Sequence, residues 1–293
     1  MKALLKITVL ALLPLLSACA TQSSMIAEDV GAVRLGIAAT RAQANISFNA
    51  SNDLVREQAV ARKISLTDRT ISESDFPILI ARETTEQWAS AFDSLDAYSS
   101  AIQSLADGSR AQETGNVVSE LAKNLNDLST QSAVPPNVAG AVSAWASALL
   151  QLRSEKRATE IMRATDEKFR NVITHMADAI GTSPTDLGSL QLVVDSNWTN
   201  SVLLMIENRY MALAVGDPQR ENVARSYIAA ISTRDAQLAN LSQLRRSLLA
   251  LADAHTAAAN GRPADALYWI KRIDSILDDM QKRADEASKE QGK

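Results

Sequence analysis

Apolar residues recur at spacings of three, four and seven along most of the 293-residue chain. This is the pattern of amphipathic α-helices, and no segment alternates with the period of two that is typical of a half-buried strand. The first stretch fits one helix or two, because Asn49, Ser51 and Asn52 can compete for backbone hydrogen bonds. The pattern predicts helices over these ranges: 25–66, 77–107, 111–131, 137–180, 185–215, 219–259 and 263–288.

Glycine and proline are sparse and mark most of the predicted boundaries. We expect Pro77 in the first turn of the second helix, where its missing N–H is not needed. Pro135 and Pro136 cannot continue a helix, so they separate the third helix from the fourth. Gly181 and Gly261 end the fourth and sixth helices. Because the connections are short, we expect consecutive helices to be antiparallel neighbours.

Each predicted helix has one apolar stripe, which it can bury only against another helix. The predicted helix at 137–180 would be about 65 Å long at 1.5 Å per residue, so it needs partners along its whole length. We therefore expect an all-α fold, an elongated antiparallel helical bundle of six or seven helices, with two tiers sharing the long helices. The bundle would occupy residues 25–288 as a single domain, or divide into sub-bundles at 25–133 and 137–288. Residues 289–293 would form a frayed tail.

The first nineteen residues, "MKALLKITVLALLPLLSAC", follow a different pattern. Lys2 and Lys6 precede an apolar run at residues 7–16, and two small residues follow the run. A charged start, a short apolar core and a small-residue cleavage zone are typical of a secretory signal peptide. The apolar run is too short to span a bilayer, which takes about 20 residues of helix. We therefore expect residues 1–18 to be a signal peptide.

The only cysteine of the chain, Cys19, comes directly after this run, in the order Leu16-Ser17-Ala18-Cys19. An aliphatic residue, two small residues and a cysteine resemble the lipobox of bacterial lipoproteins. The resemblance implies cleavage before Cys19 and lipid on both its sulfur and the new amino terminus, with residues 19–24 as a lipidated tether. Ala20 and Thr21 follow instead of the aspartate that favours the inner membrane, which implies the periplasmic face of the outer membrane of a Gram-negative bacterium. The alternative is a conventional signal peptide whose apolar core happens to contain a cysteine.

Charge restricts the choice of partners. Removal of residues 1–18 takes away Lys2 and Lys6 from the 30 basic residues and none of the 34 acidic ones, so the mature chain has 28 and 34, a net charge near −6. A mildly acidic surface with interspersed charges argues against nucleic acid as a partner. Cys19 has no second cysteine with which to pair, so disulfides do not contribute to the fold.

Groups that are typical of catalysis are few. His175 and His255 are the only histidines, and neither belongs to a Glu-x-x-His or His-Glu-x-x-His motif. Both fit structural positions at the edge of an apolar stripe. The chain also has no glycine-rich phosphate loop and no Gly-x-Ser-x-Gly motif. We therefore predict no catalytic residue, no metal site and no cofactor.

Four tryptophans are placed by the pattern on four different helices. We interpret them as core residues, and the alternative is that they line an aromatic pocket. They are Trp88, Trp145, Trp198 and Trp269.

The middle of the predicted fourth helix, "RSEKRATEIMRATDEKF", places polar side chains where the apolar stripe should continue. Buried unpaired charges there would each cost several kcal/mol. In one interpretation the stripe rotates toward Ile161 and Met162 and the helix simply curves. In a second, the segment bridges two tiers in solvent. In a third, the segment lines a polar groove that takes a ligand or a partner. The candidate site residues of the third interpretation are Arg153, Lys156, Arg163 and Asp166.

These observations favour a non-enzymatic role. We expect a membrane-anchored periplasmic helical lipoprotein that acts as a structural or protein-interaction module of the cell envelope. Its partners would be the lipid bilayer, through acylated Cys19, and an envelope protein that binds its helix faces. The alternative is a small-molecule or metal-binding module with a pocket between helices.

Overall fold

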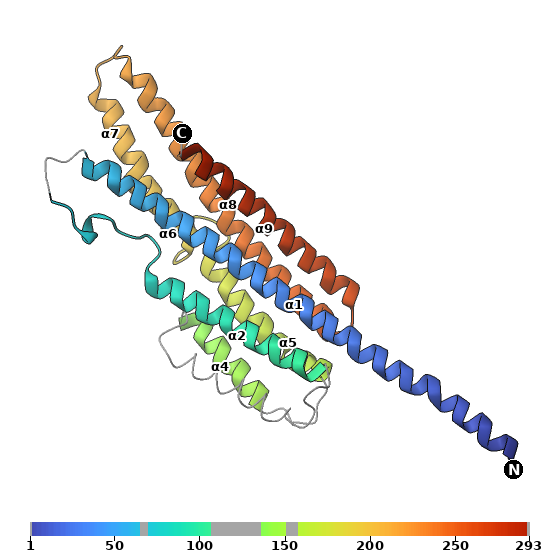
Figure 1. Ribbon diagram of the computed structural model, residues 1–293. Helices are drawn as coiled ribbons and strands as arrows, with labels where there is room; N and C mark the ends of the chain where they lie inside the picture. Colours follow the sequence, from blue (N-terminus) through green and yellow to red (C-terminus); the bar gives the residue numbers. More distant parts are fainter. Residues whose placement is uncertain (1, 65–69, 107–135, 151–157, 292–293) are drawn as a thin grey trace. The chain divides into compact units, whose positions relative to one another are not determined.

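The structure is a computed structural model of the chain and describes residues 2–64, 70–106, 136–150 and 158–291. Every regular element in these ranges is a helix, and no strand occurs among them, so the predicted all-α helical bundle is confirmed (Figure 1). The helices are α1 (Lys2–Ile64), η1 (Glu73–Asp75), α2 (Arg82–Ala106), α4 (Pro136–Leu150), α5 (Ala158–Ile180), α6 (Leu190–Asn197), η2 (Trp198–Leu203), α7 (Leu204–Ala212), α8 (Gln219–Ala259) and α9 (Pro263–Gln291).

α1 is one uninterrupted helix, so the break considered in its second half does not occur. The Ser51 hydroxyl bonds within the helix, because it donates to the backbone carbonyl of Ser47 at 2.8 Å. The helix also passes through the predicted tether at residues 19–24, which contains neither glycine nor proline to stop it. The side chains of residues 2–29 lie outside the described part of the chain.

α2 begins at Arg82, so the prediction that this helix starts near Pro77 is wrong. The side chain of Asn52 on α1 holds the preceding segment in a non-helical conformation. Its Oδ1 accepts the backbone N–H groups of Leu79 and Ile80 at 3.0 and 2.8 Å. Its Nδ2 donates to the carbonyl oxygen of Ile80 at 3.1 Å. A partner distant in sequence therefore replaces the helical turn that the proline suggests.

The predicted single helix over 137–180 is wrong, because the structure has two helices there, α4 and α5. The ring centroids of Trp145 on α4 and Phe169 on α5 are only 5.6 Å apart. In one straight helix these two residues would be about 36 Å apart at 1.5 Å per residue. α4 therefore packs back against α5, where Trp145 and Phe169 are both fully buried. The intervening residues, 151–157, and the predicted helix at 111–131 lie outside the described residues.

α6 begins at Leu190, later than the predicted start at residue 185. The side chain of Ser189 caps it by accepting the backbone N–H of Leu192 at 3.1 Å. Leu187, which falls within the predicted helix, is 94% exposed in the turn before this cap. The chain then continues through the π-helical segment η2 into α7. α8 spans its predicted range, and α9 begins at the predicted proline.

The chain divides into two compact units. Unit 1 comprises residues 1–39, 87–173 and 250–274, and unit 2 comprises residues 40–86, 174–249 and 275–293. These units do not coincide with the sub-bundles 25–133 and 137–288, because α1, α5, α8 and α9 each contribute residues to both.

Each unit has its own apolar core. Members of the core of unit 1 include Val33, Ile37, Phe92, Leu95, Ile102, Trp145, Phe169, Leu251 and Ile273. Members of the core of unit 2 include Phe48, Met176, Ile180, Val194, Trp198, Leu241, Leu244, Leu248 and Met280. The interpretation of the tryptophans as core residues is confirmed for Trp88, Trp145 and Trp198, whereas Trp269 is only partly buried.

Candidate functional site

The sequence indicates four residues that could line a polar groove: Arg153, Lys156, Arg163 and Asp166. The first two lie outside the described residues. On α5 the structure separates the other two, because Arg163 is exposed whereas Asp166 points inward and bonds to α8. Ile161 and Met162 are buried. Their burial agrees with the rotation of the apolar stripe toward these two residues, but the single curved helix of that interpretation does not occur, because α4 and α5 are separate helices.

Cys19 lies in the N-terminal part of α1, and its side chain is outside the described part of the chain. Within the described residues, no helix combines the length and the apolar character that a membrane span requires. Attachment of lipid to Cys19 stays a prediction.

Asp166 belongs to a line of polar side chains in the core of unit 1, which we call the core polar chain: Thr165, Tyr98, His255 and Asp166. The Tyr98 hydroxyl lies 2.9 Å from Thr165 Oγ1 and 3.0 Å from His255 Nε2. The other ring nitrogen of His255, Nδ1, lies 2.7 Å from Asp166 Oδ1. At the opposite end, Thr165 Oγ1 lies 2.8 Å from the backbone carbonyl oxygen of Ile161. One continuous hydrogen-bonded line thus joins α2, α5 and α8.

Aromatic rings enclose the core polar chain. Phe169 stacks on the imidazole of His255, with ring centroids 4.0 Å apart and 11° between the planes. Trp145 meets Tyr98 edge-on, with centroids 4.6 Å apart. Tyr98 is 1% exposed and His255 is 0% exposed, while the Asp166 side chain is 22% exposed. Polar groups in such a site have to satisfy one another, because water does not reach most of them.

The protonation states follow from these surroundings. Burial lowers the pKa of His255, although the carboxylate of Asp166 acts in the opposite direction. Burial also acts to raise the pKa of Asp166, but hydrogen bonds from His255 and Thr256 and the charge of Arg170 outweigh it, so this pKa lies below its usual value. Burial raises the pKa of Tyr98 far above its ordinary value. At neutral pH we therefore assign an ionised Asp166, a protonated phenol and a neutral His255 that carries its proton on Nδ1.

A second layer of bonds links the core polar chain to the surface of unit 1. Thr256 Oγ1 donates to the two carboxylate oxygens of Asp166 at 2.9 and 3.0 Å. Arg170 donates to Thr256 Oγ1 at 2.8 Å and to Asp253 Oδ1 at 2.9 Å. Because Arg170 and Asp253 are both partly exposed, their ion pair contributes little stability by itself. Its main effect is to fix Thr256, and through Thr256 the carboxylate of Asp166.

The core polar chain contains a carboxylate, an imidazole and a hydroxyl in sequence. Many hydrolases use the same sequence of groups to activate a nucleophilic hydroxyl. Here the hydroxyl belongs to Tyr98, whose burial keeps it from any substrate in this structure. None of the three surface grooves described below is lined by a member of the core polar chain. The geometry is therefore that of an internal connection between three helices.

Sequence reasoning missed the pairing of Tyr98 with His255, although it placed His255 at the edge of an apolar stripe. One feature of the sequence could have indicated this network: each of three helices carries a polar side chain on its apolar stripe. These residues are Tyr98 on α2, Thr165 on α5 and His255 on α8. The other histidine, His175, is partly exposed and is not a member of this line.

An apolar groove lies on the surface of unit 2, between α7 and α8, and we call it the α7–α8 groove. Its volume is about 400 Å³, and it is lined by Ile206, Glu207, Tyr210, Val223, Ala224, Tyr227 and Ile228. Ile228 is 64% exposed. The guanidinium group of Arg220 lies 4.1 Å from the centroid of the Tyr210 ring, a cation–π contact beside the groove. The groove thus combines exposed apolar surface with aromatic rings and an arginine.

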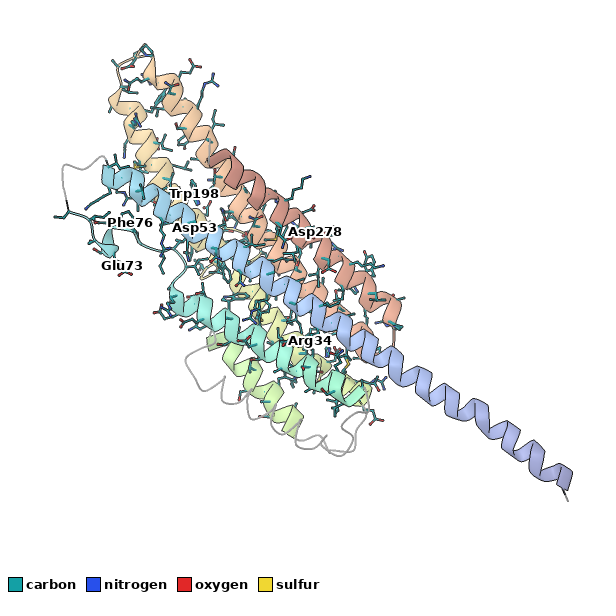
Figure 2. The ribbon with its side chains drawn as sticks, viewed as in Figure 1. Arg34, Asp53, Glu73, Phe76, Trp198 and Asp278 are labelled. Atoms are coloured by element: carbon teal, nitrogen blue, oxygen red, sulfur yellow. The ribbon has the colours of Figure 1, made fainter. Side chains whose placement is uncertain are left out.

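Two larger grooves lie elsewhere on the surface, one in each unit. One, of about 690 Å³, lies in unit 2 beside η1; Figure 2 shows two of its residues, Glu73 and Phe76, on the segment between α1 and α2. The other, of about 700 Å³, lies in unit 1 along α1, where Arg34 (labelled in Figure 2) pairs with Asp96 at 2.9 Å. Across the described ranges, no group of three histidine, cysteine, aspartate or glutamate residues is placed to hold a metal ion.

Comparison with known proteins leaves the function to be inferred from the chain's own residues. No protein-family model, no curated protein and no solved structure matches it.

Proposed function

We propose that this chain is a lipid-anchored, non-enzymatic protein of a Gram-negative cell envelope, held at the periplasmic face of the outer membrane, where it binds another envelope protein. The observation that carries the proposal is the order Leu16-Ser17-Ala18-Cys19 directly behind a charged and apolar leader. The single cysteine stands where the lipobox of bacterial lipoproteins has its acylated cysteine. The confirmed all-α fold supports the second half of the proposal, since helix pairs offer grooves in which a partner helix can bind.

The anchor has a direct physical consequence for the fold. One acyl chain gives only marginal membrane binding, at about 0.8 kcal/mol per buried methylene, and two or more give stable anchoring. α1 runs without interruption from Cys19 to Val30, which is buried in unit 1. Val30 comes eleven positions after Cys19, which corresponds to about 16 Å of helix. The lipid would therefore be joined to the buried core of unit 1 by a helical spacer.

We assign partner binding to the α7–α8 groove. Tyrosine and arginine are enriched in protein interfaces and at their energetically dominant positions, and the groove presents Tyr210 and Tyr227 with Arg220 beside them. A groove between two helices accepts the apolar face of an amphipathic helix. The expected partner is therefore an envelope protein that contributes such a helix.

Mass spectrometry of the mature chain from envelope fractions tests the anchor. We expect the first residue to be Cys19, and the N-terminal peptide to carry the added mass of acyl chains. The control is Cys19→Ala, which should lose both the added mass and the association with the outer membrane. A mature wild-type chain that begins at another residue and carries no lipid would contradict the proposed anchor.

Site-specific photo-crosslinking tests the binding face. A photoreactive side chain at Ile228 should capture one envelope protein, whereas the same side chain at Ile71 should not. Ile71 is a matched control, because it is also an isoleucine of unit 2 and is 75% exposed against 64% for Ile228. We expect Ile228→Glu to reduce recovery of the partner about tenfold, the effect of losing one strong interface contact, and Ile71→Glu to leave it unchanged. Equal capture at both positions would refute the assignment.

Binding of a small molecule is the second candidate, and the volume of the α7–α8 groove favours it. Ligand sites usually have about 300–1,000 Å³, a range that includes the 400 Å³ of this groove. Native mass spectrometry of the full chain distinguishes the two roles. A ligand would appear as a constant added mass that Ile228→Glu removes, without any captured protein.

A further inference from the structure

The core polar chain contains three hydrogen-bond contacts between side chains, and a fourth joins Thr165 to the backbone carbonyl of Ile161. Each of the four contacts needs one hydrogen atom. They join Ile161 to Thr165, Thr165 to Tyr98, Tyr98 to His255, and His255 to Asp166. The two hydroxyls supply one hydrogen each, and a neutral imidazole supplies one more. That is one hydrogen fewer than the four contacts can use. An imidazolium supplies two hydrogens and would satisfy all four contacts.

With a neutral imidazole, the hydrogen bonds run toward Asp166. His255 Nδ1–H donates to Asp166, the Tyr98 hydroxyl donates to His255 Nε2, and the Thr165 hydroxyl donates to Tyr98. Only the contact between Thr165 and the carbonyl of Ile161 is then left without a hydrogen. This loss is small, because a carbonyl inside α5 also accepts a backbone N–H.

Uptake of a proton on Nε2 reverses both hydroxyls. His255 Nε2–H then donates to Tyr98, the Tyr98 hydroxyl donates to Thr165, and the Thr165 hydroxyl donates to the Ile161 carbonyl. No heavy atom has to move, because the two contacts that reverse, Thr165–Tyr98 at 2.9 Å and Tyr98–His255 at 3.0 Å, suit donation in either direction, and Thr165 Oγ1 already lies 2.8 Å from the carbonyl oxygen of Ile161. Rotation of two hydroxyl groups is sufficient.

We propose that the core polar chain is a pH-sensitive hydrogen-bond switch in unit 1. His255 takes up one proton while the unit stays folded, and the two hydroxyls reverse their direction of donation when the proton binds.

The charges around His255 decide how readily the proton binds. The ionisable groups that act on it are Asp166 and Arg170 from α5 and Tyr98 from α2, while Asp253 on its own helix pairs with Arg170. The carboxylate of Asp166 favours the imidazolium, whereas burial and the positive charge of Arg170 oppose it. Since burial has the larger effect, the proton binds at a pH below the ordinary histidine pKa of about 6.5.

Ring ¹⁵N NMR of the histidine-labelled full chain tests the proposal. The chain contains two histidines, so His175→Gln identifies the signals of His255. We expect neutral His255 to carry its proton on Nδ1 at pH 7, and both ring nitrogens to be protonated in mild acid while the helical circular dichroism is unchanged. The proposal is overturned if His255 stays neutral until the helical signal is lost, or if Nε2 rather than Nδ1 carries the proton at pH 7.

Two variants test whether the hydroxyls of Tyr98 and Thr165 reverse their direction of donation when His255 binds the proton. Tyr98→Phe removes the acceptor that Nε2–H requires, and a buried charged donor without a partner costs more than a neutral acceptor without one. We therefore expect the proton affinity of His255 to fall about tenfold, one pKa unit. Thr165→Val removes the acceptor of the reversed Tyr98 hydroxyl, so it should act in the same direction and provides a second test should the first variant not fold. An unchanged titration midpoint in the folded variant would overturn the proposal.

Discussion

Gly36 lies where the backbone of α1 approaches α8 and α9 in unit 1. A Cβ atom built on Gly36 would lie 2.5 Å from Ile270 Cδ1, 3.3 Å from Leu251 Cδ1 and 3.5 Å from Ile273 Cδ1. All three side chains are buried, so they cannot move aside into solvent. Gly36→Ala therefore forces the surrounding core of unit 1 to shift.

Two opposing effects set the size of the change. Replacing a glycine inside a helix by alanine stabilises the helix by about 1 kcal/mol. Adding a methyl group to a packed core costs about 1–3 kcal/mol, and a contact at 2.5 Å, far inside the optimal separation of about 3.5–4.0 Å, places Gly36 in the upper half of that range. We expect a net loss of about 1 kcal/mol from the free energy of unfolding.

Gly31 is the matched control on the same helix. Its added Cβ would meet only Gln103 Nε2, at an ordinary 3.5 Å. Gly31→Ala should therefore keep the helical gain of about 0.5–1 kcal/mol. Thermal unfolding followed by circular dichroism should separate the two variants by roughly 3–8 °C, with Gly36→Ala below the wild type and Gly31→Ala above it. Equal stabilisation by both substitutions would refute the packing of α1 against Leu251, Ile270 and Ile273.

The other predictions concern a helix cap and two titrations. Ser189→Ala removes the side-chain cap of α6 and should lower the free energy of unfolding by about 1 kcal/mol, measured in urea. Hydrogen bonds led by that of Thr182 lower the pKa of Asp186 to about 2, so its carboxyl should titrate near that value by NMR, and Thr182→Val should raise the pKa. Because burial lowers the pKa of His255, the unfolded chain binds this proton more readily than the folded one below about pH 6.5. The contribution of His255 to wild-type stability should therefore fall as the pH drops from about 6.5 and become constant below the folded pKa of this residue. His255→Gln should abolish this slope, and His175→Gln should preserve it.

The class of fold could be predicted from the sequence because the apolar stripes are local and repeat at the helical period. The start of α9 could be predicted for the same reason, since Pro263 fixes it within one residue. The start of α2 could not be predicted, because it depends on Asn52, whose amide bonds to Leu79 and Ile80, far from it in sequence. When a residue distant in sequence determines where a helix begins, the spacing of apolar residues along the chain does not reveal that start.

The division of the predicted fourth helix into α4 and α5 has a related cause. A continuous helix and a helical hairpin can share the same apolar periodicity, because each half keeps its own stripe in both arrangements. What separates them is the contact between Trp145 and Phe169, which only the hairpin allows. The pattern of spacings does not contain that information.

Asp166 shows why a polar gap in an apolar stripe is an ambiguous signal for a binding site. An unpaired buried charge is costly, so a carboxylate at such a position suggests an external partner. The structure removes that cost internally, since α8 supplies His255 and Thr256 to the carboxylate and α2 supplies Tyr98 to the imidazole. The useful question is whether other helices carry complementary polar groups on their own stripes. Where they do, as here, an internal network explains the gap. Arg163, only three residues from Asp166 along α5, has its side chain exposed and needs no such partner.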